Sequence, residues 1–124
     1  MMTRFKIPAL ALAILTLLAA SLAMAQDAPA PTRILVVDSY HHEYPWSAGI
    51  RRGIHEVLGV HAGDRDRARS ADGRLEIWTE FMDTKRHPER DWAERAAQRV
   101  AGVVDSWHPD LVIASDDNAV KHVV

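Results

Sequence analysis

The chain has 124 residues, with 15 Lys and Arg against 17 Asp and Glu, and a formal net charge of −2. A balanced, slightly acidic chain without a dominant basic patch is not typical of proteins that bind nucleic acid or anionic lipid surfaces. The sequence contains no cysteine. This excludes disulfides, zinc sites with thiolate ligands, cysteine-based catalysis and the thiol attachment of a lipoprotein.

The first 25 residues have the layout of a secretory signal peptide. Arg4 and Lys6 form a basic start, Ile7–Leu18 is a mostly apolar stretch, and Ala23-Met24-Ala25 is a small-x-small cleavage signature. The alternative is an uncleaved anchor, but a membrane-spanning helix needs roughly 20 apolar residues, and this run is shorter. We therefore predict cleavage after Ala25 and a periplasmic mature protein that is not stably inserted in the membrane.

Residues 26–32 contain two prolines and are expected to form an extended leader, so that the folded domain covers residues 33–124. Arg33–Ser39 is an apolar, β-branched run, which predicts a buried strand. From Trp46 to Leu58 the apolar residues recur at the spacing of a helix with one buried stripe. Ser47 is the expected N-cap of this helix, and Gly59 is its expected C-terminal stop.

The segment Gly59–Gly73 is rich in Asp, Arg, Gly and Ala, and its lack of a periodic apolar pattern predicts a solvated loop. In Leu75–Phe81, mostly apolar side chains alternate with a more polar set, and this period of two predicts a second strand. One face of this strand is more polar than the other. We therefore expect it to lie nearer an edge of the sheet than the first strand.

The clearest helical pattern covers Pro88–Trp107, with Pro88 suited to the first helical position and Asp91 and Arg95 spaced for an i,i+4 ion pair. Leu111–Ser115 predicts a third buried strand, and another helix is expected to begin near Asp117 or Asn118. The apolar, helix-like ending of the sequence carries no stop signal. This ending indicates a fragment of a longer protein.

The predicted order is β-α-β-α-β-α, with connections long enough for right-handed crossovers. This order indicates an α/β fold with a doubly wound parallel sheet. The carboxyl ends of its strands lie along one edge, and ligands bind outside that edge. Each predicted strand runs into a polar cluster, and these clusters are Asp38-Ser39-Tyr40, Asp83-Thr84 and Ser115-Asp116-Asp117-Asn118.

The ligand-binding candidates are the polar residues that follow the three strands: Ser39, Tyr40, Asp83, Ser115 and Asp116. Each also has a structural interpretation. Asp38 and Ser39 can cap the loop after the first strand, and Asp83 can pair with the basic residues Lys85 and Arg86. Asp and Asn are ordinary helix N-caps, and we assign that role to Asp117 or Asn118.

No catalytic or metal site is predicted. The adjacent pair His41-His42 lacks an evident third ligand, and neighbouring side chains point apart. The sequence has neither a Gly-x-Ser-x-Gly elbow nor a glycine-rich phosphate loop with lysine. Ile34–Asp38 is similar to the start of a response-regulator receiver domain, but Ser39 stands where a receiver needs a second acid, and receivers are cytoplasmic. We therefore expect neither enzymatic activity nor a cofactor.

Three segments together resemble one known family. They are Ser39-Tyr40-His41 followed by Tyr44-Pro45-Trp46, the run Glu80-Phe81-Met82-Asp83-Thr84-Lys85-Arg86, and the run from Pro109 to Ala119 that includes Ser115-Asp116-Asp117-Asn118. These segments are similar to the opening of ABC-transporter substrate-binding-like proteins, a family that also includes sensor regions of some histidine kinases. The resemblance covers nearly all of the chain after the leader, apart from the loop Gly59–Gly73.

The resemblance implies a type 1 periplasmic-binding fold, in which two α/β lobes close on a small molecule without catalysis. Residues 33–124 then form the N-terminal, truncated part of lobe one. The implied function is that of an exported solute-binding protein that delivers a small-molecule ligand to an inner-membrane ABC transporter permease. The alternative is an extracytoplasmic ligand-sensing module of a histidine-kinase signalling protein.

Overall fold

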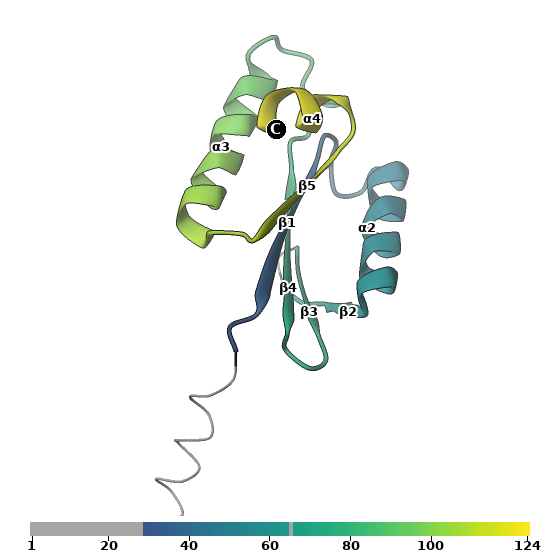
Figure 1. Ribbon diagram of the computed structural model, residues 1–124. Coiled ribbons are helices and arrows are strands. Elements are labelled where there is room, and N and C mark those ends of the chain that lie inside the picture. The colour runs from purple at the N-terminus through teal and green to yellow at the C-terminus, as the bar shows by residue number, and fades with distance from the viewer. Residues whose placement is uncertain (1–28, 65) are drawn as a thin grey trace, which may run out of the picture. The chain divides into compact units, whose positions relative to one another are not determined.

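The computed structural model describes residues 29–64 and 66–124, and Pro31–Val124 form one unit (Figure 1). The predicted signal peptide and residues 26–28 of the predicted leader lie outside the described residues. The elements are, in chain order, β1 (Thr32–Asp38), α2 (Pro45–Leu58), β2 (Val60–Ala62), β3 (Arg67–Ser70), β4 (Leu75–Phe81), α3 (Trp92–Trp107), β5 (Leu111–Ser115) and α4 (Asp117–Val123).

The domain is a mixed α/β structure with one five-stranded sheet in the order β2-β3-β4-β1-β5. Strand β1 pairs in parallel with both β4 and β5, whereas β3 is antiparallel to β2 and β4. Four strands therefore run in one direction, and β3 alone runs in the other. Helix α2 lies on one face of the sheet, and α3 and α4 lie on the other (Figure 1).

The central strand β1 explains why both faces are covered. Its alternate side chains enter two different cores. Leu35 and Val37 pack with α3 and α4, and Ile34 and Val36 pack on the side of α2. All four are buried, which confirms the prediction of a buried strand from the continuous apolar run.

The prediction of a loop at Gly59–Gly73 is wrong, because this segment contains β2 and β3. Of the seven residues in these two strands, only Val60 and Ala68 are buried and apolar, so no periodic apolar pattern marks them. The hairpin extends the sheet next to β4. As a result, the sheet is not purely parallel, and β4 is an interior strand rather than one near the edge.

The helices form where expected, but two of their starts differ. The helix predicted from Pro88 begins at Trp92, and Pro88 lies in the preceding turn region. Helix α2 begins at Pro45, and Ser47 does not cap it, since its hydroxyl donates to Asp38. Gly59 ends α2 at φ +62°, as predicted, and α4 begins at Asp117. The N-cap role assigned to Asp117 or Asn118 is wrong, because Asp116 occupies that position and its side chain makes no cap hydrogen bond. The predicted ion pair between Asp91 and Arg95 is also present.

Strand β5 is the last strand on its side of the sheet and is less buried than predicted. Leu111 is 51 % exposed and Val112 is 36 % exposed. The chain leaves β1 through α2 to reach β4 on one side, and then passes through α3 to β5 on the other side. The strand order therefore reverses at β1. The point between the carboxyl ends of β1 and β5 is where open α/β sheets form a binding crevice.

Candidate functional site

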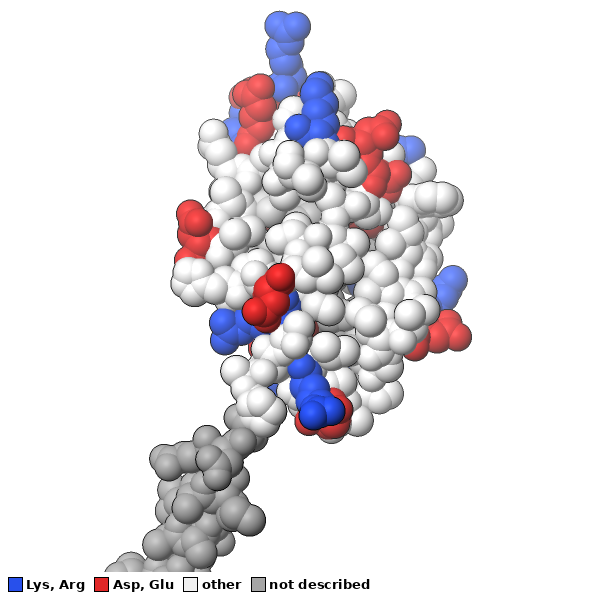
Figure 2. All heavy atoms as spheres, viewed as in Figure 1, with Lys and Arg blue, Asp and Glu red and all other residues white. Residues whose placement is uncertain are grey.

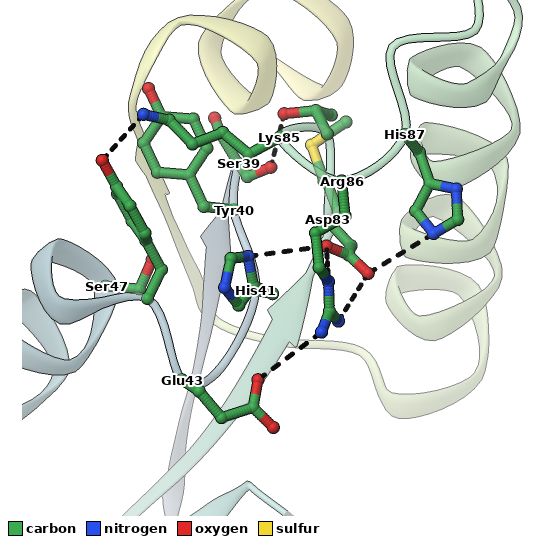
Figure 3. Close-up of polar contacts among 12 residues, drawn as sticks. Ser39, Tyr40, His41, Glu43, Ser47, Asp83, Lys85, Arg86 and His87 are labelled. Carbon is green, nitrogen blue, oxygen red and sulfur yellow. Dashed lines mark hydrogen bonds and ion pairs between the residues drawn. The ribbon is translucent and has the colours of Figure 1, made fainter.

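The polar clusters that follow β1, β4 and β5 meet at one edge of the sheet, as predicted. In the strand register Asp38 pairs with both Phe81 and Ser115, so the three strands end at the same level. Backbone hydrogen bonds join the residues just beyond: Met82 donates to Asp38, and Asp83 donates to Tyr40. We call this region the carboxyl edge, and Figure 3 shows its side chains.

Ser39 ties the three clusters together. Its side chain is 0 % exposed, and its Oγ donates to the Ser115 carbonyl (2.9 Å) while accepting from the Ala119 amide (2.8 Å). Its own carbonyl accepts from both the amide (2.9 Å) and the hydroxyl (2.7 Å) of Thr84. A serine hydroxyl has one proton to donate, and here the proton is already used. The structure therefore places Ser39 in the framework beneath the edge rather than at its surface.

Asp38 is also a framework residue. Its carboxylate is buried, and Oδ1 accepts from the Ser47 hydroxyl (2.8 Å) and from the Tyr40 amide (2.9 Å). Both contacts fix the loop between β1 and α2. This is the structural role that the sequence suggested for Asp38.

Two tyrosines and a lysine form the first accessible group at the edge. The rings of Tyr40 and Tyr44 meet edge to face at 5.1 Å between centroids, and Lys85 Nζ lies 5.0 Å and 4.5 Å from them. Lys85 Nζ also donates to Tyr44 Oη at 2.7 Å, and this hydrogen bond raises the pKa of Lys85. Burial, and then the charge of Asp116, raises the pKa of Tyr40. The group thus presents a positive charge beside two phenol rings.

Trp46 and Asp116 form the second accessible group, which lies at the end of β5. Trp46 is 58 % exposed, and its Nε1 donates to Asp116 Oδ2 at 2.9 Å. The Ser115 hydroxyl approaches the same oxygen at 3.3 Å. Asp116 has φ +70° and ψ 171°, a conformation that is essentially restricted to glycine and costs of order 1–3 kcal/mol. An aromatic ring and a carboxylate are therefore held together at the switch point between β1 and β5.

Asp83 belongs to a separate network at the end of β4 (Figure 3). Its two oxygens accept from Nε (2.8 Å) and Nη2 (2.7 Å) of Arg86, and His41 and His87 each bring a ring nitrogen to 3.6 Å. The Arg86 hydrogen bonds are the main reason why the pKa of Asp83 is lowered. The His87 ring in turn stacks on Trp92 with 3.6 Å between centroids. The Asp83 carboxylate is thus already occupied by groups of its own chain.

Replacing Asp83 with asparagine tests this network. Because the folded-state pKa is lowered, the stabilisation is complete above the unfolded-state pKa of about 3.9 and is lost as the pH falls through the folded-state pKa. We expect Asp83→Asn to lower the free energy of unfolding by about 1 kcal/mol at pH 7, and the difference to shrink below about pH 4. Asparagine tolerates the observed φ of +57°, so the backbone is not a confounding factor.

Urea denaturation at pH 7 and pH 3 measures the effect, and Asp105→Asn, at an exposed position on α3, is the matched control. A difference between Asp83→Asn and wild type that stays constant with pH would show that the ion pair does not contribute.

The structure separates the five predicted ligand residues into three sets. Tyr40, Ser115 and Asp116 lie partly exposed at the edge, Ser39 is buried beneath it, and Asp83 is engaged with Arg86. Sequence reasoning left Lys85 as a surface or salt-bridge residue, although its position four residues after Phe81 brings it over the tyrosines. It also missed that Asn118 Nδ2 donates to the Thr84 hydroxyl (3.1 Å), which joins α4 to the loop after β4.

Charges of both signs are mixed on the face of the described residues that Figure 2 shows, where basic and acidic side chains are interspersed. Within residues 29–64 and 66–124, no three His, Asp or Glu side chains are grouped so as to hold a metal ion. In the same part of the chain, every helix is too short or too polar to cross a membrane.

Comparison with known proteins assigns the chain to no group: no family model, curated protein or solved structure matches it.

Proposed function

We propose that the chain is part of an exported solute-binding protein with a type 1 periplasmic-binding fold, which binds a small molecule for an ABC-type importer. The carboxyl edge is one wall of the ligand cleft in this proposal. Tyr40, Trp46, Lys85 and Asp116 contact the ligand, while Ser39 and Asp38 hold the wall in shape. The protein performs no catalysis.

The observation that carries the proposal is the position of the accessible polar and aromatic side chains at the point where the strand order reverses. Trp46 and Asp116 meet at the end of β5. Tyr40 follows β1, and Lys85 reaches over its ring from the loop after β4. Binding sites commonly combine aromatic surface with a few fixed polar groups. Here a lysine ammonium and an aspartate carboxylate are presented together, so a polar or ring-containing molecule fits the wall best.

A thermal-shift screen of amino acids, sugars and aromatic acids tests ligand binding. One class is expected to raise Tm, and a ligand at ten times its Kd adds about 1.4 kcal/mol, or roughly 6–11 °C for a domain of this size. Lys85→Met is expected to reduce this shift by at least half. Lys121→Met removes the same charge from an exposed position on α4 and serves as the control. The absence of a shift with every class would contradict the proposal.

Export is tested separately from binding. When residues 1–124 are produced in a Gram-negative host, intact-mass analysis of the periplasmic fraction is expected to show a chain that begins at Gln26. Replacing Ala23 and Ala25 with arginine is expected to block processing, because the cleavage site requires small side chains. Recovery of the uncleaved wild-type chain in the membrane fraction would instead support the anchor alternative.

A further inference from the structure

A pocket lies between α2 and the turn of the β2–β3 hairpin. It is separate from the wall formed by Tyr40, Trp46, Lys85 and Asp116. Its volume is about 360 Å³. Four of its lining residues carry ionisable groups that can face a ligand: His42 from the loop after β1, Arg51 and His55 from α2, and Asp66 from the hairpin. Arg67 also lines the pocket, but its guanidinium packs over Trp78, 3.5 Å from the ring centroid, on the opposite face of the sheet.

Arg51 is the residue of this pocket whose bonding is incomplete. Its Nη1 is shielded from solvent and has no hydrogen-bond partner among residues 29–64 and 66–124. The guanidinium carbon lies 5.7 Å from the centroid of the Phe81 ring, so an apolar surface supports the group without satisfying its N–H donors. Buried donors are nearly always paired, so the Arg51 donor can take a partner that the described residues do not supply.

The surroundings of Arg51 favour a negatively charged partner. Burial, and then the positive charge of Arg51, lowers the pKa of His55. His42 also lines the pocket, with its ring centroid 5.4 Å from that of Phe81. Among the described residues that line the pocket, Asp66 alone carries a carboxylate, and it lies 3.3 Å from His42 Nε2.

We propose that this pocket binds a small oxyanion, a phosphate or a carboxylate, through the guanidinium of Arg51, with His55 and His42 as flanking donors. The planar fork of an arginine matches the two oxygens of either group, and the resulting hydrogen bonds are charge-assisted. Ala62 and Gly63, which also line the pocket, leave room for the rest of an organic acid. The site is independent of the function proposed for the carboxyl edge, because none of its residues belongs to the wall.

The test is an NMR titration of the imidazole signals of His55 and His42 in the folded chain. Inorganic phosphate and benzoate are the two probes, and sodium chloride at matched ionic strength is the reference. At least one probe is expected to give saturable shifts of the His55 signals that chloride does not give. Phosphate acting alone identifies a phosphate site, and benzoate acting alone identifies a site for an organic carboxylate.

Matched arginine variants decide which residue holds the anion. Arg51→Gln is expected to weaken binding at least about tenfold, the loss typical of a charge-assisted hydrogen bond. Arg52→Gln removes the same charge from an exposed neighbour that does not line the pocket, and binding is expected to change by less than about twofold. The absence of a saturable response to either anion, or equal weakening in the two variants, would overturn the proposal.

Asp66→Asn gives an independent result if Arg51→Gln does not fold. Asparagine accepts the φ of +59° at this position and removes the charge that opposes an anion. Binding is expected to tighten several-fold. Unchanged or weaker binding in this variant would count against an anion site.

Discussion

Replacing Leu35 with alanine is expected to lower the free energy of unfolding by about 3–4 kcal/mol, the largest effect of any single substitution considered. Leu35 is 0 % exposed in the central strand and packs in the core formed with α3 and α4. The change removes three carbon atoms and leaves a cavity between rigid elements, which cannot close around alanine without moving a helix. Urea denaturation with a constant m-value measures the loss.

Leu111→Ala is the matched control for this substitution. The same side chain is removed from the same sheet, but at a half-exposed position on β5, so the expected loss is about 1 kcal/mol or less. Equal losses at the two positions would mean that the core is not organised around β1.

Removing the hydroxyl of Ser39 is expected to cost about 2 kcal/mol. Ser39→Ala leaves the Ala119 amide, at the start of α4, without its acceptor in a buried position, and an unsatisfied buried donor costs roughly 1–3 kcal/mol. Hydrogen exchange at the Ala119 amide is expected to accelerate more than exchange in β1. Such a local effect would show that α4 loosens first.

The control for Ser39→Ala is Ser106→Ala in α3. Unlike Ser39, the Ser106 hydroxyl bonds only to carbonyls of its own helix, at an exposed position. Its removal is expected to change stability by less than about 0.5 kcal/mol. If Ser39→Ala is equally mild, Ser39 does not hold the three clusters together.

The sequence predicted the parts of the fold that depend on local apolar patterns. The buried strand at β1, the helices α2 and α3, and the beginning of α4 follow from strand-like runs and helical spacing, whereas the predicted N-caps were wrong. It did not predict β2 and β3. Their seven residues are held by ladder hydrogen bonds to a neighbour and by contacts such as the Arg67 guanidinium over Trp78. Neither leaves a periodic signal in the sequence.

The candidate site, like the fold, could be predicted from the sequence only in part. The convergence of three polar clusters follows from strand direction alone, so it was predictable. The roles of single residues were not, because they depend on partners distant in sequence. Ser39 accepts from Ala119, 80 positions later, and Ser47 donates to Asp38 rather than to its own helix. Only the folded structure shows that Ser39 is a buried residue that links neighbouring segments by hydrogen bonds, whereas Asp116 is accessible.

The left-handed backbone at Asp83 and Asp116 has a consequence for comparing this chain with relatives. At φ +57° and φ +70° these positions suit glycine better than aspartate. Random substitution should therefore drift towards glycine wherever the carboxylate is not needed. A relative with glycine at position 116 retains the turn but lacks the carboxylate that accepts the hydrogen bond from Trp46. A relative with aspartate there retains the strain together with the charge. The identity of this one residue would thus sort relatives by how they use the end of β5.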